Sequence, residues 1–149
     1  MKKRLFLRLL AAGALSTQLS AYAAATVVEV YKSESCGCCT KWVRHLEQNG
    51  FSVKAKNVAN PSDYRGKSGI PNELGSCHTG LAEGYALEGH VPAAQIKRLL
   101  AEKPEARGLA VPAMPMGSPG MEGPTKHPYR VLLVDARGKH TVYKHYAGH

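Results

Sequence analysis

The first third of the chain contains two apolar stretches on either side of an amphipathic one. Residues 26–31 are rich in β-branched side chains and residues 51–58 alternate apolar and polar positions, so both are predicted strands. Between them, a cysteine-rich turn leads into about ten residues whose apolar positions lie three and four apart, which predicts a helix. This helix ends at Asn49-Gly50, where glycine is a favourable C-terminal cap. The chain is therefore predicted to begin with a strand, a cysteine turn, a helix and a second strand.

The middle of the chain has weaker periodicity. Asn60 is a predicted N-cap and Pro61 a predicted first residue of a short helix, which the glycines and the proline in residues 66–71 end early. Residues 80–91 fit either a twisted hairpin or an irregular helix, and strands are the favoured interpretation. Residues 92–101 predict a clearer helix, because a proline starts it and another follows its end.

The last third is a long loop followed by a hairpin. Residues 108–128 contain five prolines, four glycines and three methionines, and a loop of this length in a compact domain is usually functional or disordered. Two β-rich stretches, residues 129–134 and 141–146, are separated by a predicted turn and indicate a β-hairpin. The order of elements predicts an α/β fold of the thioredoxin-like type, a mixed sheet flanked by helices, with an irregular insertion and a long Met/Pro/Gly loop.

The N-terminal segment has the pattern of a signal peptide. A basic start is followed by the mostly apolar residues 5–15 and by Ala21-Tyr22-Ala23, which predicts cleavage after Ala23. The apolar run is short for a membrane-spanning helix and no stop-transfer pattern follows, which argues against an uncleaved anchor. We therefore expect a signal peptide over residues 1–23 and one exported domain over residues 24–149.

Charge excludes one class of partner. The chain has a formal net charge of +9, of which four positive charges lie in the N-terminal segment, on Lys2, Lys3, Arg4 and Arg8. The rest are scattered along the domain, which is typical of a soluble surface and not of a nucleic-acid-binding stripe. We expect no nucleic-acid partner and, after cleavage, no membrane association.

Three of the four cysteines lie in the motif C-G-C-C, as Cys36, Cys38 and Cys39. Cys36 and Cys39 have C-x-x-C spacing, and an exported protein meets an oxidising compartment, so a disulfide between them with a separate Cys38 is one interpretation. On the helix, Cys39 shares the apolar face with Trp42, whereas Cys38 lies on the solvent face. Thiolates are favoured at a helix N-terminus. Three of them could bridge several soft ions, which leaves Cu(I), zinc and iron–sulfur clusters as candidates.

The methionines narrow this choice. Apart from Met1, all of them lie in one proline- and glycine-rich segment, as Met114, Met116 and Met121. A loop methionine commonly packs on its own domain, but these three have no common period that would bury them together. A thioether is a poor ligand for zinc and a good one for Cu(I), so the donor set predicts copper.

Two histidines add candidate ligands. His78 directly follows Cys77, and His90 lies at a constrained position just before a predicted helix. A partly buried, hydrogen-bonded structural histidine is an equal alternative for His90. The three histidines after residue 139 are expected to be solvated, with a metal-collecting tail as the alternative.

Four motifs together resemble those of a known family. C-G-C-C after a strand, S-C-H-T, E-G-H-V-P and V-P-A-M-P-M-G-S-P-G-M-E are similar to motifs of a bacterial family of exported copper proteins that includes CopG, and the resemblance extends from about Val27 to Tyr146. It implies a periplasmic, thioredoxin-like protein linked to copper resistance, with a multinuclear copper cluster at the C-x-C-C motif. The expected metal ligands are Cys36, Cys38, Cys39, Cys77, His78, His90, Met114, Met116 and Met121.

The resemblance has one small departure and one structural implication. Ala113 stands where the family pattern usually has glycine, which hardly touches ligand chemistry. Thioredoxin-like folds have a cis-proline loop facing the cysteine turn, and Val111-Pro112 is the candidate for it. Such a loop would deliver Met114 and Met116 close to Cys36.

Three functions remain compatible with the sequence. The favoured one is an exported copper-binding protein that buffers Cu(I) and could interconvert Cu(I) and Cu(II), as a copper oxidoreductase would, because imidazole also tolerates Cu(II). The alternative is a thiol–disulfide oxidoreductase in which Cys36 attacks and Cys39 resolves, although that chemistry has no use for Cys38 or the methionines. The third is a copper chaperone that transfers its ion to a trafficking or redox partner protein.

Overall fold

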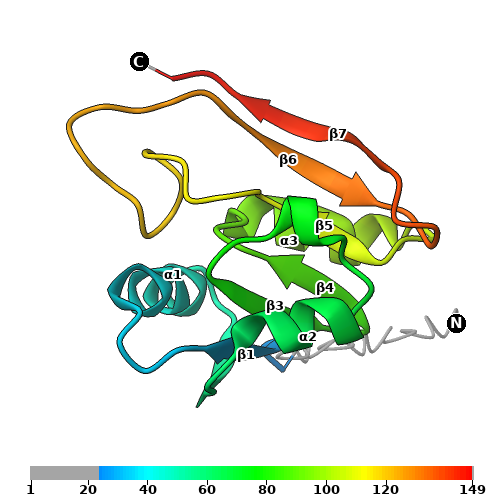
Figure 1. Ribbon diagram of the computed structural model, residues 1–149, viewed down its shortest axis with the longest axis horizontal. Helices are drawn as coiled ribbons and strands as arrows, with labels where there is room; N and C mark the ends of the chain where they lie inside the picture. The colour runs from blue at the N-terminus through cyan, green and yellow to red at the C-terminus, as the bar shows by residue number, and fades with distance from the viewer. Residues whose placement is uncertain (1–23, 149) are drawn as a thin grey trace, which may run out of the picture.

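A computed structural model describes residues 24–148 of the chain (Figure 1). The elements occur in this order: β1 (Val27–Lys32), α1 (Gly37–Gln48), β2 (Ser52–Asn57), α2 (Pro61–Lys67), the 3-10 helix η1 (Asn72–Leu74), β3 (His78–Ala82), β4 (Tyr85–Glu88), α3 (Ala93–Glu102), β5 (Gly108–Ala110), β6 (Tyr129–Val134) and β7 (His140–Tyr146). The predicted signal peptide lies outside the described residues. Within them, no helix has the length and apolarity needed to cross a bilayer.

The described strands form one mixed sheet of seven strands in the order β2-β1-β3-β4-β5-β6-β7. The pairs β1–β2 and β4–β5 are parallel, and the other four pairs are antiparallel. Together with the three α-helices, this confirms the predicted α/β class and the predicted mixed sheet.

Helices cover both faces of the sheet. Trp42 and Leu46 of α1 pack with Ile96 of α3 in one buried cluster on one face, and a second buried cluster that includes η1 lies on the other face. Neighbouring residues of β4 divide between them, Leu87 joining the first cluster and Ala86 the second, as the alternation of side chains along a strand requires. Figure 1 shows α2 in front of the sheet and α3 behind it.

Most predicted elements are confirmed. The chain begins strand, helix, strand, and residues 80–91 contain the end of β3 and all of β4, an antiparallel hairpin that turns at Glu83-Gly84. One expectation was wrong: Gly108–Ala110, predicted as loop, forms the short strand β5. Leu109 is fully buried, and a methyl group on Gly108 would lie 1.8 Å from the Ala86 carbonyl oxygen, so the glycine permits close contact between β4 and β5.

The sheet places the Cys77 segment beside the cysteine turn. Because β3 is antiparallel to β1, its first residue, His78, pairs with Lys32, the last residue of β1 and the start of the turn. The expected cis bond at Val111-Pro112 was wrong, since the described residues contain no cis peptide bond. The pairing of β3 with β1 brings the segment ending in Cys77 to the turn.

Candidate metal centre

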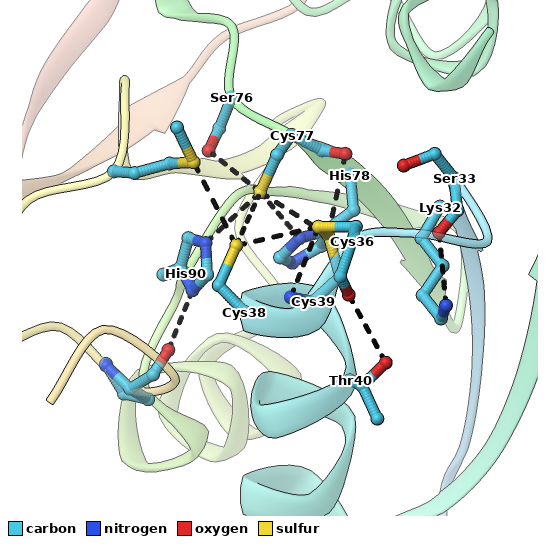
Figure 2. The surroundings of a disulfide bond; sticks show 12 residues. Lys32, Ser33, Cys36, Cys38, Cys39, Thr40, Ser76, Cys77, His78 and His90 are labelled. Carbon is cyan, nitrogen blue, oxygen red and sulfur yellow. Dashed lines mark hydrogen bonds between the residues drawn. A yellow bond between two sulfur atoms is a disulfide. The ribbon is translucent and has the colours of Figure 1, made fainter.

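Four cysteine sulfurs gather around the N-terminus of α1 (Figure 2). Cys77 Sγ lies 3.9 Å from Cys38 Sγ and 3.5 Å from Cys39 Sγ. Cys36 Sγ lies 3.5 Å from Cys38 Sγ. The four sulfurs all lie within 4.8 Å of one another, which is close enough for them to share metal ions. The sulfur predicted from two distant motifs therefore converges on one site.

Two of the four sulfurs are joined in this state. Cys36 and Cys39 form a disulfide, whereas Cys38 and Cys77 are free. The structure thus has the disulfide with a separate Cys38 that the spacing allowed. Cys39 is fully buried, as the helical pattern predicted, and Cys36 Sγ accepts a hydrogen bond from the Cys39 amide at 3.3 Å. Reduction by two electrons and two protons would release both sulfurs as ligands.

His90 is oriented for ligation. Its Nδ1–H donates to the Pro119 carbonyl oxygen at 2.8 Å, and a carbonyl can only accept, so the proton of the neutral ring lies on Nδ1. The lone pair on Nε2 then faces Cys77 Sγ at 3.2 Å. Metal-bound histidines commonly have such a second hydrogen bond, which fixes the ring orientation.

His78 has fewer polar contacts than His90. Its Nδ1 lies 3.4 Å from Cys77 Sγ, but its buried Nε2 has no hydrogen-bond partner among the described residues. The ring packs on Trp42 with ring centroids 4.3 Å apart, and the Trp42 indole donates to the Val91 carbonyl oxygen at 2.8 Å. Aromatic packing therefore fixes the place of the His78 ring, while the protein leaves its tautomer open.

The three loop methionines differ in position. Met114 Sδ lies 4.0 Å from Cys38 Sγ, so the long loop does deliver one thioether to the cysteines. Met116 lies against Gly123 of the same loop: a methyl group added to Gly123 would be 2.6 Å from Met116 Cε. The sulfur contacts found in the described part of the chain include none from Met116 or Met121 to a cysteine. Their roles as ligands remain predictions.

Burial controls the protonation of this site. Burial, followed by the nearby charge of Cys38, raises the pKa of the Cys77 thiol to about 12. Burial lowers the pKa of the His90 ring, and the Pro119 carbonyl opposes that change. In the metal-free chain Cys77 is therefore a thiol that donates to a neutral His90 ring. A cation bound here would have to displace the Cys77 proton, so metal binding should release protons.

Comparison with known proteins identifies relatives of this arrangement. A family model described as a protein of unknown function, DUF411, matches residues 74–121, which include Cys77, His90 and Met114. Two solved structures of a copper resistance protein, CopG Form 2 and Form 1, are 42% and 43% identical to the chain with a TM-score of 0.78 each. Each match covers 82% of this chain and 98% of the other. This chain belongs to the CopG family. None of the curated proteins matches it.

The residues of this CopG-family chain suit copper. Thiolate and thioether sulfur select soft ions such as Cu(I), and imidazole is an acceptable additional ligand. The cluster combines four cysteine sulfurs, two of them joined as a disulfide in this state, with a thioether at Met114 and two imidazoles, one of which has an unpartnered, buried nitrogen. Among the described residues, the two clusters of potential metal ligands contain only cysteine and histidine, and neither contains a carboxylate. The donor chemistry therefore fits the metal that the sequence predicted.

Sequence reasoning missed the residues that support these ligands. The Pro119 carbonyl that orients His90 carries no signal in a sequence, because any residue has a carbonyl. Glu88, which accepts hydrogen bonds from Ser76 and Thr79, does carry one. It is a carboxylate within an otherwise apolar strand, directly before Gly89-His90, and a charge in a predicted buried strand indicates a buried partner.

The stability of the metal-free chain should fall as the pH drops below about 6.5. Burial, His90 and Lys32 lower the pKa of His78 to about 3, against 6.5 in an unfolded chain. Between these values the unfolded state binds more protons, so the stabilisation present above pH 6.5 is lost on acidification. The loss from His78 should be about 2 kcal/mol between pH 6.5 and 5, measurable by urea unfolding.

A His78→Leu variant is the control for this effect. Leucine keeps an apolar side chain beside Trp42 and cannot titrate, so its stability should vary less with pH over the same interval. Parallel stability curves for the two proteins would contradict the assignment.

Proposed function

We propose that this chain is an exported protein that binds copper, chiefly as Cu(I), in a multinuclear site built from the cysteine cluster. The observation that carries the proposal is the convergence of Cys77 and Met114, from two distant segments, on the cysteines at the start of α1. Membership of the CopG family supports it, because the solved relatives are named copper resistance proteins. We extend the role in copper resistance and homeostasis to this chain.

The proposal includes a thioredoxin-like fold and export. Three features support that fold: the parallel strands β1 and β2 joined through α1, the antiparallel hairpin of β3 and β4 that pairs with β1 through β3, and the C-x-x-C turn at the start of α1. The basic, apolar and Ala-x-Ala succession in residues 1–23 supports export, with the periplasm as the compartment that the family resemblance implies.

In this proposal each group has a defined role. Cys38 and Cys77 would bind copper whether or not the Cys36–Cys39 disulfide is present. Cys36 and Cys39 would become additional ligands once that disulfide is reduced. His90 binds through Nε2, His78 is its partner on the buried side, and Met114 covers the exposed side next to Cys38. Met116 and Met121 complete the proposed ligand set. Bound copper would supply one-electron chemistry between Cu(I) and Cu(II), which the mixture of sulfur and imidazole donors tolerates.

Cys38→Ser should bind fewer copper ions per chain than the wild type while folding normally. Cys38 lies within 4.0 Å of three other sulfurs and is only half-buried, so its loss removes a bridging ligand at little cost in stability. The measurement is an anaerobic Cu(I) titration of the reduced domain against a chromophoric chelator. Unchanged stoichiometry in the variant would defeat this part of the proposal.

The Cys36–Cys39 disulfide favours a second candidate, a thiol–disulfide oxidoreductase. In that reaction the Cys36 thiolate would attack a substrate disulfide, and Cys39 would then displace the reduced substrate, leaving the disulfide seen here. The fully buried Cys39 beside a more exposed Cys36 fits these two roles.

Disulfide reductase assays on copper-free protein distinguish the two candidate functions. The oxidoreductase predicts disulfide reductase turnover that is lost in Cys36→Ser and kept both in Cys38→Ser and in a triple leucine variant of Met114, Met116 and Met121. The copper-binding proposal predicts negligible turnover and altered copper binding in Cys38→Ser. Turnover unaffected by Cys36→Ser would exclude the oxidoreductase mechanism.

A chaperone role would place this chain beside a partner protein that accepts its copper or its electrons. Met114 is about half exposed, with 47% of its surface accessible, so a partner could reach the thioether side of the site. This would be a transfer function of the same proposed site.

A further inference from the structure

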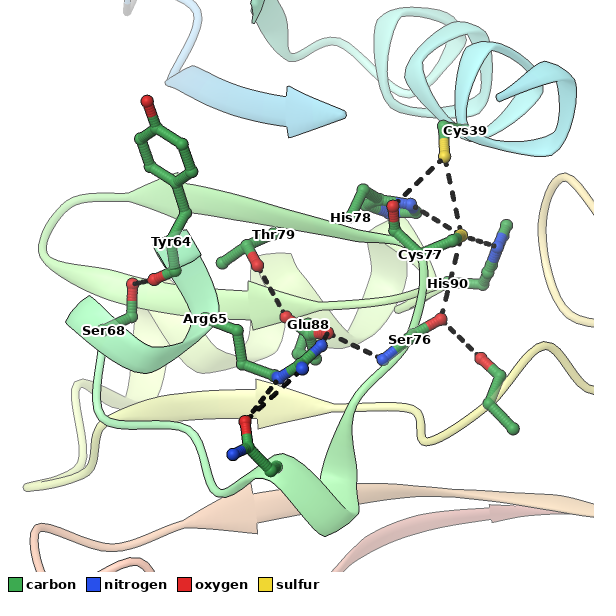
Figure 3. A network of polar contacts seen from close by, with 12 residues as sticks. Cys39, Tyr64, Arg65, Ser68, Ser76, Cys77, His78, Thr79, Glu88 and His90 are labelled. Atoms are coloured by element: carbon green, nitrogen blue, oxygen red, sulfur yellow. Dashed lines mark hydrogen bonds and ion pairs between the residues drawn. The ribbon is translucent and has the colours of Figure 1, made fainter. Parts of the chain in front are cut away.

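The α2 face of the sheet contains a fully buried carboxylate, Glu88, that is not a metal ligand (Figure 3). Its Oε1 accepts a hydrogen bond from the Ser76 amide at 2.7 Å and contacts Arg65 Nη1 at 3.3 Å. Its Oε2 accepts a hydrogen bond from the Thr79 hydroxyl at 2.7 Å. Donors from α2, from the segment before β3 and from β3 itself therefore meet on one side chain.

Two of these donors flank the candidate ligands Cys77 and His78. Ser76 comes directly before this pair and Thr79 directly after it, so the carboxylate fixes the chain on both sides. Thr79 and Glu88 are also cross-strand partners in the β3–β4 hairpin. Because side chains alternate along a strand, His78 points to the opposite face, where it packs on Trp42. Glu88 thus supports the site from behind the sheet.

The same contacts extend to His90. It follows Glu88 by two residues, and the Gly89 between them has a φ of +71° and touches the Cys77 segment closely. A methyl group on Gly89 would lie 2.6 Å from Ser76 Cβ and 2.5 Å from the Val111 carbonyl oxygen. The Gly89 amide also donates to the His78 carbonyl oxygen at 3.0 Å. A displacement of Ser76 would therefore be transmitted to His90.

Ser76 also links this network to the methionine loop. Its hydroxyl donates to the carbonyl oxygen of Ala113, the residue before Met114, at 2.5 Å, and the Ala113 amide donates to the Gly75 carbonyl oxygen at 3.0 Å. One buried side chain therefore lies at the centre of contacts that reach Cys77, His78, His90 and Met114.

Stability alone gives little reason for a carboxylate here. Burying a charge is costly, and replacing a buried ion pair by apolar side chains is often neutral or stabilising. The Arg65 contact is monodentate and longer than a strong charge-assisted hydrogen bond. Burial raises the pKa of the Glu88 carboxyl, while the Thr79 hydroxyl and the Ser76 amide oppose that rise. The short bonds go to the residues beside the candidate ligands.

We propose that Glu88 is a positioning residue that holds Cys77, His78 and His90 in a geometry able to bind copper. The inference rests on the proposed copper site and adds to it the group that preorganises three of its ligands. Outer hydrogen-bond partners of this kind typically change metal affinity by about 10- to 100-fold when they are lost.

The test compares Glu88→Ala with Glu88→Gln in the reduced domain under anaerobic conditions. Alanine removes all three contacts, and Cu(I) affinity measured by chelator competition should fall by about 10- to 100-fold, with a changed thiolate-to-copper charge-transfer spectrum. Glutamine keeps an oxygen that accepts from Ser76 and an amide that can donate to the Thr79 hydroxyl, so it should remain within about threefold of wild type. Wild-type affinity and spectrum in Glu88→Ala would overturn the proposal, and so would equal losses in the two variants, because charge and not position would then be decisive.

Two further variants exclude a general effect of lost stability. Leu99→Ala creates a cavity in the core under α3, so it should lower the melting temperature and leave Cu(I) affinity unchanged. Equal affinity losses in Leu99→Ala and Glu88→Ala would overturn the proposal. If Glu88→Ala does not fold, Thr79→Val decides, since it removes one of the bonds with little change in shape. A loss of at least about threefold supports positioning, and unchanged affinity contradicts it.

Failure of this inference differs from failure of the copper site itself. If wild type and Cys77→Ser bind Cu(I) equally weakly, the proposed site is wrong and the role of Glu88 in it is overturned with it. If wild type binds tightly and Glu88→Ala binds equally well, only the positioning role is wrong.

Discussion

Cys77→Ser is expected to lower the Cu(I) affinity of the reduced chain by at least about 100-fold, or about 3 kcal/mol. Cys77 Sγ contacts both Cys38 and Cys39 and both imidazoles, so within residues 24–148 it is the sulfur that joins the C-G-C-C turn to the histidines. A serine oxygen is a hard, weakly acidic donor that does not replace a thiolate for a soft ion. The measurement is chelator competition with anaerobic, fully reduced protein.

The melting temperature of the metal-free protein provides the control for this variant. Serine is only slightly smaller than cysteine, and residue 77 is partly exposed. The melting temperature of the metal-free protein should therefore change by only a few degrees. Proton release on Cu(I) binding should also fall by about one proton, because Cys77 is protonated in the metal-free chain. Wild-type affinity in a folded Cys77→Ser protein would remove Cys77 from the site.

Gly120→Ala is expected both to destabilise the chain and to weaken copper binding. Gly120 has a φ of +89°, and a methyl group there would lie 2.7 Å from the Cys38 carbonyl oxygen, 3.0 Å from the Trp42 amide nitrogen and 3.2 Å from His90 Nδ1. Backbone strain of about 1 to 2 kcal/mol and overpacking of about 1 to 3 kcal/mol should combine. Displacing the loop would also break the Pro119–His90 contact, so Cu(I) affinity should fall by about tenfold or more.

Gly84→Ala is the matched control for Gly120→Ala. Gly84 has nearly the same φ, +86°, but a methyl group there would meet no atom within 4 Å. Urea unfolding should show only the backbone strain, about 1 to 2 kcal/mol, and copper affinity should stay at the wild-type value. Equal effects of the two substitutions on affinity would show that the contacts of Gly120 with the site do not matter.

Local patterns predicted most of the fold. The β-branched run in β1, the cysteine turn, the amphipathic α1 and the prolines at the starts of α2 and α3 are signals within a few neighbouring residues, and the structure confirms those elements. Strand β5 was missed because its three residues lie in a proline- and glycine-rich segment and depend on packing against β4 and β6. Pairing of that kind is long-range and leaves almost no local pattern.

In the candidate site, too, local motifs predicted some features, whereas others depend on long-range pairing. Residue chemistry predicted the cysteines, His78, His90 and Met114, and family resemblance grouped them, but the contact of Cys77 with the turn depends on the antiparallel pairing of β3 with β1. The cis-proline expectation was placed at residues 111–112 by analogy alone and was wrong, since the described residues contain no cis peptide bond. Met114, two residues further on, still lies 4.0 Å from Cys38 Sγ. The buried Glu88 network joins residues from three elements that are up to 23 positions apart, so no single motif contains it.

X-ray absorption at the copper edge tests the central claim most directly. The reduced domain, loaded anaerobically with Cu(I), should show a first coordination shell dominated by sulfur, a smaller contribution from imidazole nitrogen and copper–copper scattering from neighbouring ions. A shell of nitrogen and oxygen alone, or a chain that retains no copper after desalting, would contradict the account.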